Sequence, residues 1–305
     1  MKKVSLIPFV CSAGGQVPGS EKGALDLKKS GLAEALRKAS RLAVGWQIDP
    51  AEIYDLPQGE AAHKNLPPLG SRERKDIVVW HCRYLQAQVL KALHEKKLPV
   101  TIGGDHAMAV GSISAVAKFK NAYGRTGVIW IDAHADLNTP DTSPSQAIHG
   151  MPVAALMGMG DMDYVEIAGD RPVINPRHIV YIGLRDIDPG EQEYIKRFGI
   201  PVFTMQDIRR LGIKEVFARA VALLEGTVAK VISVDLDGFD PAEVPSVGSP
   251  AAGGLATEET LEALKELSEK VAFDLIEIAE YNPALPGRDK TYSFVEKLLN
   301  ALLPS

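Results

Sequence analysis

The segment Val128–Asp136 reads VIWIDAHAD. Its first half, Val128–Ile131, is an apolar, β-rich run without alternation, which is typical of a strand buried on both faces of a parallel sheet. Asp132, His134 and Asp136 follow directly. If strand geometry continues, residues i, i+2 and i+4 share a face, so we expect these three side chains to point into one pocket. Two carboxylates and an imidazole favour Mn²⁺, Fe²⁺ or Zn²⁺.

The same alternation of apolar runs and helical patterns continues along the chain. The expected strands are Val4–Val10, Ala43–Ile48, Leu98–Ile102, Val128–Ile131, His178–Ile182, Pro201–Thr204, Val228–Val234 and Ala272–Ile278. The main expected helices are Ala24–Ser40, Arg72–Lys96, Ala107–Tyr123, Ile213–Glu225 and Thr291–Leu303, with loops at Asp55–Ser71 and Asp161–Pro176. This order predicts an α/β fold, a single three-layer α/β/α domain spanning residues 1–305 with a largely parallel central sheet.

Composition limits the classes of function. Of the 305 residues, 46% are hydrophobic and 24% are charged, which is ordinary for a globular protein. The net charge of −5 offers no basic excess, so we expect neither a nucleic-acid partner nor an anionic membrane surface. No apolar stretch reaches membrane-spanning length. Cys11 and Cys82 imply no disulfide framework, and a reducing cytoplasm is the expected compartment.

Polar residues recur at the ends of the predicted strands. His106 follows Leu98–Ile102 through a glycine pair, and Glu280 follows the last strand. Asp235 and Asp237 come at the end of Val228–Val234. Because ligands bind at the carboxyl ends of strands in open α/β sheets, we expect these side chains to share one rim.

The candidate metal ligands are His106, Asp132, His134, Asp136, Asp235 and Asp237. Four carboxylates in one pocket raise one another's pKa, and two divalent cations would neutralise them. A water that bridges two such cations loses a proton near neutral pH and becomes a hydroxide nucleophile. The residues therefore indicate a two-metal hydrolase.

The same segments resemble the ureohydrolase family, and within it the arginases. The matching segments are GGDHAMAVGSIS (Gly103–Ser114), DAHADLNTP (Asp132–Pro140), HGMPV (His149–Val153), GLRDIDPGE (Gly183–Glu191), SVDLDGFDP (Ser233–Pro241) and EYNP (Glu280–Pro283). They are spread over nearly the whole chain in the family's order, which is more specific than any single motif.

The resemblance implies a binuclear manganese centre, with two Mn²⁺ per subunit. One ion would take His106, Asp132, Asp136 and Asp235, and the other would take Asp132, His134, Asp235 and Asp237. The implied reaction is hydrolysis of L-arginine to urea and ornithine by a hydroxide that bridges the metals. Asp136 would give a proton to the leaving amine, and His149 would act as a proton shuttle. Glu280 would pair with the guanidinium group.

Substrate recognition is also implied by the resemblance. Asn138, Ser143 and Ser145 would bind the α-carboxylate of arginine, and Asp188 and Glu191 would bind its α-ammonium group. Agmatine has no carboxylate and would leave those donors unpaired, which favours arginine. For the two acids, ordinary capping of a helix that begins at Pro189 is a serious alternative.

One departure from the family leaves the substrate open. The chain has Gln146-Ala147 where arginases typically carry Gly-Asn. The alternatives are therefore a ureohydrolase for agmatine or guanidinobutyrate, or a non-catalytic metal-binding relative. By analogy with the family we also expect a homo-oligomer, either a trimer or a hexamer.

Overall fold

The computed structural model describes residues 3–40 and 42–303. Its strands form one sheet in the order β2-β1-β3-β8-β7-β4-β5-β6, and every pairing is parallel. The strands are β1 (Lys3–Pro8), β2 (Ala43–Trp46), β3 (Leu98–Ile102), β4 (Thr126–Ile131), β5 (Ile179–Ile182), β6 (Val202–Phe203), β7 (Ala229–Asp235) and β8 (Leu275–Ala279). Each overlaps a predicted strand, so the predicted α/β fold is confirmed.

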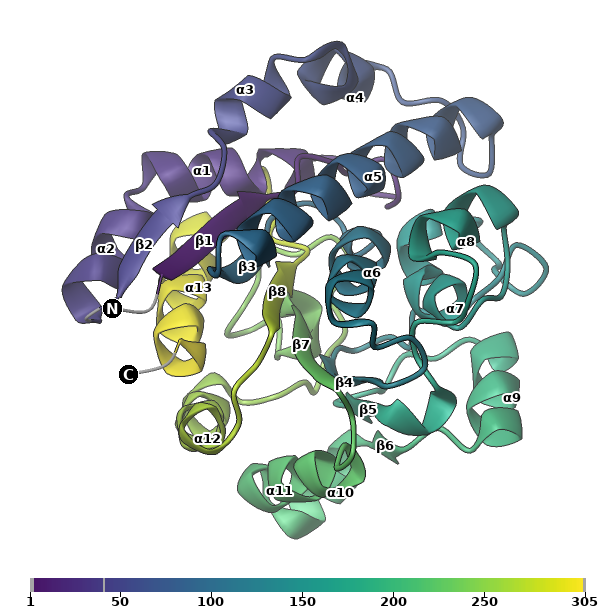
Figure 1. Ribbon diagram of the computed structural model, residues 1–305, viewed down its shortest axis with the longest axis vertical. Helices are drawn as coiled ribbons and strands as arrows, with labels where there is room; N and C mark the ends of the chain where they lie inside the picture. Colours follow the sequence, from purple (N-terminus) through teal and green to yellow (C-terminus); the bar gives the residue numbers. More distant parts are fainter. Residues whose placement is uncertain (1–2, 41, 304–305) are drawn as a thin grey trace.

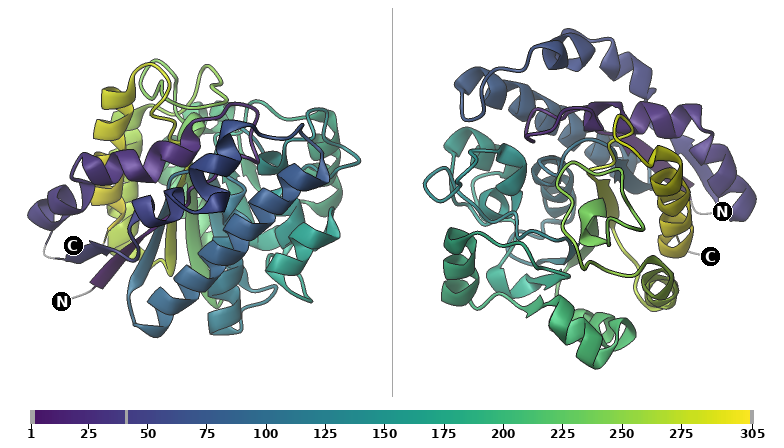
Figure 2. Two further views of the ribbon diagram at one scale, coloured as in Figure 1. Left: turned by 90° about the horizontal axis from the view of Figure 1, so that it is seen from above. Right: turned by 180° about the vertical axis from the view of Figure 1, so that it is seen from behind.

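Helices cover both faces of the sheet (Figures 1 and 2). One layer holds α5 (Arg72–His94), α6 (Met108–Lys120), α7 (Pro152–Leu156), α8 (Met162–Ala168) and α9 (Pro189–Phe198). The other holds α1 (Gly23–Lys29), α2 (Leu32–Ala39), α10 (Met205–Leu211), α11 (Ile213–Leu223), α12 (Thr257–Lys270) and α13 (Arg288–Leu302). Along β4, Val128 and Trp130 pack against the first layer, whereas Ile129 and Ile131 pack against the second. The period of two places successive side chains in opposite cores.

The shorter elements connect these layers. They are α3 (Pro50–Tyr54), α4 (Ala62–Lys64), η1 (Ser20–Lys22), η2 (Pro57–Ala61), η3 (Ile148–Gly150), η4 (Pro176–His178) and η5 (Leu236–Gly238). No helix in residues 3–40 and 42–303 combines the length and apolar character needed to cross a lipid bilayer.

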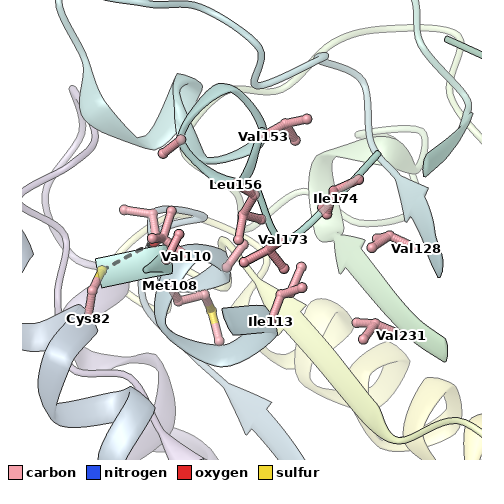
Figure 3. Packing of buried hydrophobic residues seen from close by; sticks show 14 of the residues in the cluster. Cys82, Met108, Val110, Ile113, Val128, Val153, Leu156, Val173, Ile174 and Val231 are labelled. Atoms are coloured by element: carbon pink, nitrogen blue, oxygen red, sulfur yellow. Dashed lines mark hydrogen bonds between the residues drawn. The ribbon is translucent and has the colours of Figure 1, made fainter. Parts of the chain in front are cut away.

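The core between the first helix layer and the sheet is tightly packed (Figure 3). Met108, Val110 and Ile113 of α6 lie among side chains from α7 and the central strands. A Cβ atom on Gly111 would come 2.3 Å from the carbonyl oxygen of Cys82 on α5, so glycine permits the close approach of these helices. Because α6 begins just after His106, this packing fixes the start of the helix next to that residue.

Three sequence predictions of local structure were wrong in part. The helix expected over Ala24–Ser40 is two helices, because Gly31 adopts a left-handed φ of 82° between them. The loop expected over Asp55–Ser71 contains η2 and α4. The irregular region expected over Asp161–Pro176 contains α8, where the side chain of Asp161 caps the helix by accepting from the N–H of Asp163.

The strand order gathers the predicted site. The four middle strands are β3, β8, β7 and β4, and the segments that follow them carry His106, Glu280, Asp237 and Asp132 respectively. In the sheet, β3 and β4 are the outer strands of this group, and β8 and β7 lie between them. Such a reversal of strand order is where open α/β sheets bind ligands.

Candidate metal centre and substrate cavity

The first half of the candidate metal centre surrounds the ring of His106. Its Nδ1 atom lies 3.2 Å from Oδ2 of Asp132, 3.1 Å from Oδ2 of Asp136 and 3.0 Å from Oδ2 of Asp235. All four side chains are buried. Segments after β3 and β4 and the end of β7 therefore bring three carboxylate oxygens to one imidazole nitrogen.

The second half lies around His134. Its Nδ1 atom is 3.1 Å from Oδ2 of Asp237 and 3.5 Å from Oδ1 of Asp132. His106, Asp132 and Asp136 form one group of side chains that could hold a metal ion, and Asp132, His134 and Asp237 form another. Asp132 turns a different oxygen to each group, which is the arrangement that a bridging carboxylate needs.

The predicted ligands converge for a different reason from the one that the sequence suggested. β4 ends at Ile131, so the alternation of a strand does not extend through Asp132, His134 and Asp136. Instead, Oδ1 of Asp132 accepts from the N–H of His134 at 2.7 Å, and Asp235 accepts in the same way from the N–H of Asp237 at 2.9 Å. These side-chain-to-backbone turns bend the chain back at both strand ends.

The donor set fits a divalent cation. Nδ1 of His106 is a buried atom without a hydrogen-bond partner among the described residues, although three carboxylate oxygens lie within 3.2 Å. None of these oxygens is placed where an N–H group would point, whereas a cation at the centre could be bound by all of them. Carboxylate and imidazole ligands together suit Mn²⁺, Fe²⁺ or Zn²⁺.

The ionisation of the carboxylates leads to the same conclusion. Burial and the charges of Asp237 and Asp132 raise the pKa of Asp235 well above its ordinary range. Burial and Asp132 also raise the pKa of Asp136, and they raise that of Asp237 to about 6. Burial opposes the ionisation of Asp132 as well, but the nearby imidazoles of His106 and His134 outweigh it and lower its pKa. Without cations the cluster therefore retains protons that metal ions would displace.

A buried chain of hydrogen bonds orients His106. Its Nε2 atom lies 2.8 Å from Oγ of Ser233, which in turn donates to Oε1 of Glu277 at 2.8 Å. The indole of Trp130 stacks on the imidazole with ring centroids 4.1 Å apart and donates to Asp132 at 2.9 Å. These supporting residues were not predicted from the sequence. The one available signal was Glu277 itself, a charged side chain within the apolar strand LIEIA.

Two arginines that were not predicted to belong to the site fix the loops around it. Arg185 donates to five backbone carbonyls, including those of Asp237 and Gly238. Arg74 donates to the carbonyls of Ala13 and Gly15 in the loop that follows β1. Nothing in the local sequence of either arginine indicates these long-range partners.

His149 and Glu280 form an ion pair beside the centre. Nδ1 of His149 lies 2.9 Å from Oε1 of Glu280, and the same oxygen accepts from the N–H of His106 at 2.9 Å. Burial opposes the charge on His149, but Glu280 outweighs it and raises its pKa to about 9. Burial likewise opposes the ionisation of Glu280, and His149 lowers its pKa. The pair therefore holds a protonated imidazole in place.

A cavity of about 390 Å³ opens over the centre. Its lining includes His134, Asp136, Asn138, Ser143, Ser145, Ala147, His149, Asp188, Glu191, Asp235 and Asp237. His106, Asp132 and Glu280 are not among the lining residues and are buried. No lysine or arginine lines the cavity in the described part of the chain.

The side chains predicted to donate hydrogen bonds to the substrate carboxylate differ in the hydrogen bonds that they already make. Oγ of Ser143 accepts from the N–H of Gln146 at 2.9 Å, and Oγ of Ser145 accepts from the N–H of Ala147 at 3.2 Å. Each hydroxyl thus keeps its own proton to donate. Asn138 already donates to Asp188 at 2.8 Å, which orients its amide.

The predicted binding acids are also part of the helix start. Glu191 accepts from the N–H of Leu137 at 3.0 Å and from the N–H of Asp188 at 2.9 Å. Burial raises its pKa to about 7. The capping alternative is therefore observed for Glu191, although both acids also border the cavity.

Comparison with known proteins gives matches over the full length of the chain. Residues 2–303 match the model of the Arginase family. The arginase of Bacillus caldovelox is 36% identical over 312 residues, covering 99% of this chain and 98% of that protein. The crystal structure of arginase from Bacillus subtilis has a TM-score of 0.87 at 34% identity, covering 100% of this chain and 99% of that one. Entamoeba histolytica arginase in complex with L-ornithine has a TM-score of 0.85 at 30% identity, covering 99% of each chain.

Proposed function

The chain belongs to the arginase family of ureohydrolases, and we propose that it hydrolyses the guanidinium group of L-arginine to urea and ornithine. The observation that supports this best is the buried Nδ1 atom of His106, which faces three carboxylates and shares Asp132 with a second ligand group. The family implies a binuclear metal centre, and these two groups would provide ligands for it.

The reaction adds water to the guanidinium carbon and breaks its bond to the alkyl nitrogen. Two divalent cations, when bound, supply the water activation that this weak electrophile requires. Asp136 lines the cavity and would pass a proton to the leaving nitrogen, so that the amine departs as an ammonium ion. His149, held by Glu280, would exchange protons with solvent. Glu280 would also pair with the guanidinium group.

We propose manganese as the metal, two ions per subunit, because oxygen ligands outnumber nitrogens in both groups. We also propose that the protein forms a homo-oligomer, trimeric or hexameric, which light scattering on the purified protein would test.

We propose the cytoplasm as its compartment, because its two buried cysteines are not in disulfides.

Arginine is favoured by the donors at the far end of the cavity. Ser143 and Ser145 each keep a hydroxyl proton to donate to a carboxylate. An amine substrate without a carboxylate would leave these hydroxyls unpaired, which reduces its transition-state binding. Asp188 borders the same cavity and would accept from the α-ammonium group.

The test is urea release from a panel of guanidines by protein loaded with Mn²⁺. We expect arginine to be cleaved with a higher kcat/KM than agmatine or guanidinobutyrate. Asp136→Asn should abolish urea release, and Asp141→Asn, which changes an exposed acid of the same loop, should not. Faster cleavage of agmatine would refute the choice of substrate, and a normal rate in Asp136→Asn would refute the role of that residue.

A second substrate class is favoured by one observation. Ala147 lines the cavity with a methyl group, and the lining includes acids but no cationic side chain among the described residues. This environment suits a substrate whose far end is neutral or cationic, such as agmatine. Ala147→Asn adds an amide donor to the lining, so it should lower the KM for arginine and leave that for agmatine unchanged.

A further inference from the structure

A second cluster of metal-binding side chains lies outside the acid-rich centre. Sγ of Cys11, one ring nitrogen of His63 and one of His81 all lie within 4.8 Å of one another. Cys11 follows β1, His63 belongs to α4 and His81 to α5. All three residues are buried, with exposed fractions of 0%, 8% and 2% respectively.

Each imidazole already has one nitrogen fixed by the backbone. Nδ1 of His63 lies 2.7 Å from the carbonyl oxygen of Gly59, and Nε2 of His81 lies 2.7 Å from that of Gln58. Carbonyl oxygens accept, so each of these nitrogens carries the proton. Nε2 of His63 and Nδ1 of His81 are therefore the unprotonated nitrogens. A hydrogen bond from the opposite nitrogen to a carbonyl is how metal-binding histidines are usually oriented.

We propose that Cys11, His63 and His81 bind a Zn²⁺ ion. Zinc takes cysteine and histidine ligands at about 2.3 Å and 2.0–2.1 Å, which puts the ligand atoms of a tetrahedral site about 3.3–3.8 Å apart. Because the ligand atoms all lie within 4.8 Å of one another, the side chains need to close by no more than about 1.5 Å around the ion.

The surrounding charges support a cation at this site. The carboxylate of Glu21 is buried and accepts from Oγ of Ser12 at 2.6 Å, next to Cys11 in the chain. A cysteine thiolate and this carboxylate would together balance the two charges of zinc. The positive charge of Arg74 disfavours a cation nearby, but its guanidinium group already donates to the carbonyls of Ala13 and Gly15.

The two centres differ in the metal that they favour. The acid-rich centre offers mostly oxygen ligands, which suit manganese, whereas the cluster of Cys11, His63 and His81 offers sulfur and nitrogen, which suit zinc. Burial lowers the pKa of His81 to about 3, so its imidazole is neutral at physiological pH and can bind a metal. Burial and Asp105 raise the pKa of the Cys11 thiol, so zinc must displace the thiol proton.

Zinc at this site would connect three distant segments next to the catalytic loops. The N–H of Ser12 donates to Nε2 of His63 at 3.2 Å, and a metal bond at that nitrogen replaces this contact. Two residues further on, the carbonyl of Gly14 accepts from the N–H of His149 at 3.1 Å. The proposed ion would therefore fix segment 57–64, which includes η2 and α4, to the loop that supports His149.

The test uses cobalt as a probe on the full-length protein whose acid-rich centre has first been loaded with Mn²⁺. Cobalt bound to a thiolate gives an intense near-ultraviolet sulfur-to-metal charge-transfer band, and the acid-rich centre contains no cysteine. We expect this band in the wild type and its loss when Zn²⁺ is added. Cys11→Ala and His81→Asn should abolish the band and weaken zinc binding by at least about 100-fold. Replacing a residue that only supports a ligand already costs 10- to 100-fold in metal affinity, and these two residues would be ligands themselves.

Cys82 provides the matched control. It is the other buried free cysteine, and its thiol donates to the carbonyl of Ala107 at 3.2 Å. Cys82→Ala should keep the band. Absence of the band in the wild type, or its persistence in Cys11→Ala, would overturn the proposal and leave the histidines as structural residues that bind segment 57–64.

A second measurement covers the case in which Cys11→Ala does not fold. X-ray absorption at the zinc edge of the wild-type protein should show one sulfur ligand at about 2.3 Å together with imidazole ligands. A shell of nitrogen and oxygen alone would overturn the proposal. Urea release is measured separately on the manganese-loaded enzyme. A negative result for the zinc site would therefore not bear on the proposed hydrolase activity.

Discussion

Replacement of Ser233 by alanine tests how the structure holds the first metal group. The Ser233 hydroxyl accepts from Nε2 of His106 and donates to Glu277, so Ser233→Ala removes the link that fixes the imidazole. Loss of such a supporting hydrogen bond typically costs 10- to 100-fold in metal affinity, or about 1.4–2.7 kcal/mol. We expect weaker Mn²⁺ binding in this range, measured by calorimetric titration of metal-free protein.

The free energy of unfolding of Ser233→Ala provides a second test of the same hydrogen bond. Nε2 of His106 is buried, so a missing acceptor should cost about 1–3 kcal/mol of stability in the metal-free protein. Chemical denaturation in the presence of a chelator measures this.

Ser112→Ala is the matched control, because Ser112 also donates to Glu277, whereas the described hydrogen bonds of its hydroxyl do not include His106. It should keep the Mn²⁺ affinity of the wild type. If Ser233→Ala binds Mn²⁺ as tightly as the wild type, or if both variants lose the same affinity, the orientation of His106 does not depend on this chain of hydrogen bonds.

Three further predictions concern packing, pH and metal. Gly111→Ala should lower the free energy of unfolding by about 1–3 kcal/mol, because its Cβ would meet the carbonyl oxygen of Cys82, whereas Gly45→Ala, with open space around it, should not; denaturant unfolding compares them. Glu191 has its pKa raised by burial from 4.5 to about 7, so between these values the unfolded state loses its proton first and stability falls as pH rises. Metal-free Glu191→Gln should lack this loss, about 3 kcal/mol between pH 4.5 and pH 7, and a pH-independent difference from wild type in chemical denaturation contradicts it. Mn²⁺ at 100 times its dissociation constant should add about 2.7 kcal/mol per site and raise the midpoint of thermal unfolding, and an unchanged midpoint argues against binding.

The sequence allowed the sheet and the grouping of the candidate metal ligands to be predicted because both follow local rules. Buried parallel strands are continuous apolar runs, and their carboxyl ends share one edge of the sheet. His106, Asp132 and Asp235 could therefore be grouped without knowing the strand order. The detailed reason was wrong, since turns rather than strand alternation bring Asp132 and His134 together.

The parts that could not be predicted depend on partners far away in the chain. Ser233 and Glu277 matter because β7 and β8 are neighbours in the sheet, and strand order is not written in a local pattern. Arg185 acts through backbone carbonyls, which look alike in any sequence. Helix α8 escaped notice because it is short and follows a glycine-rich stretch, although Asp161 was a usable capping signal.

The insertion of β7 and β8 between β3 and β4 has a consequence for biosynthesis. β3 and β4 are synthesised well before β7 and β8, and they have no direct pairing with each other. The carboxylates of Asp235 and Asp237 can reach His106 and His134 only once the later strands occupy the space between β3 and β4. Neither candidate metal group is therefore complete before β7 and β8 have been synthesised and have paired with their neighbours.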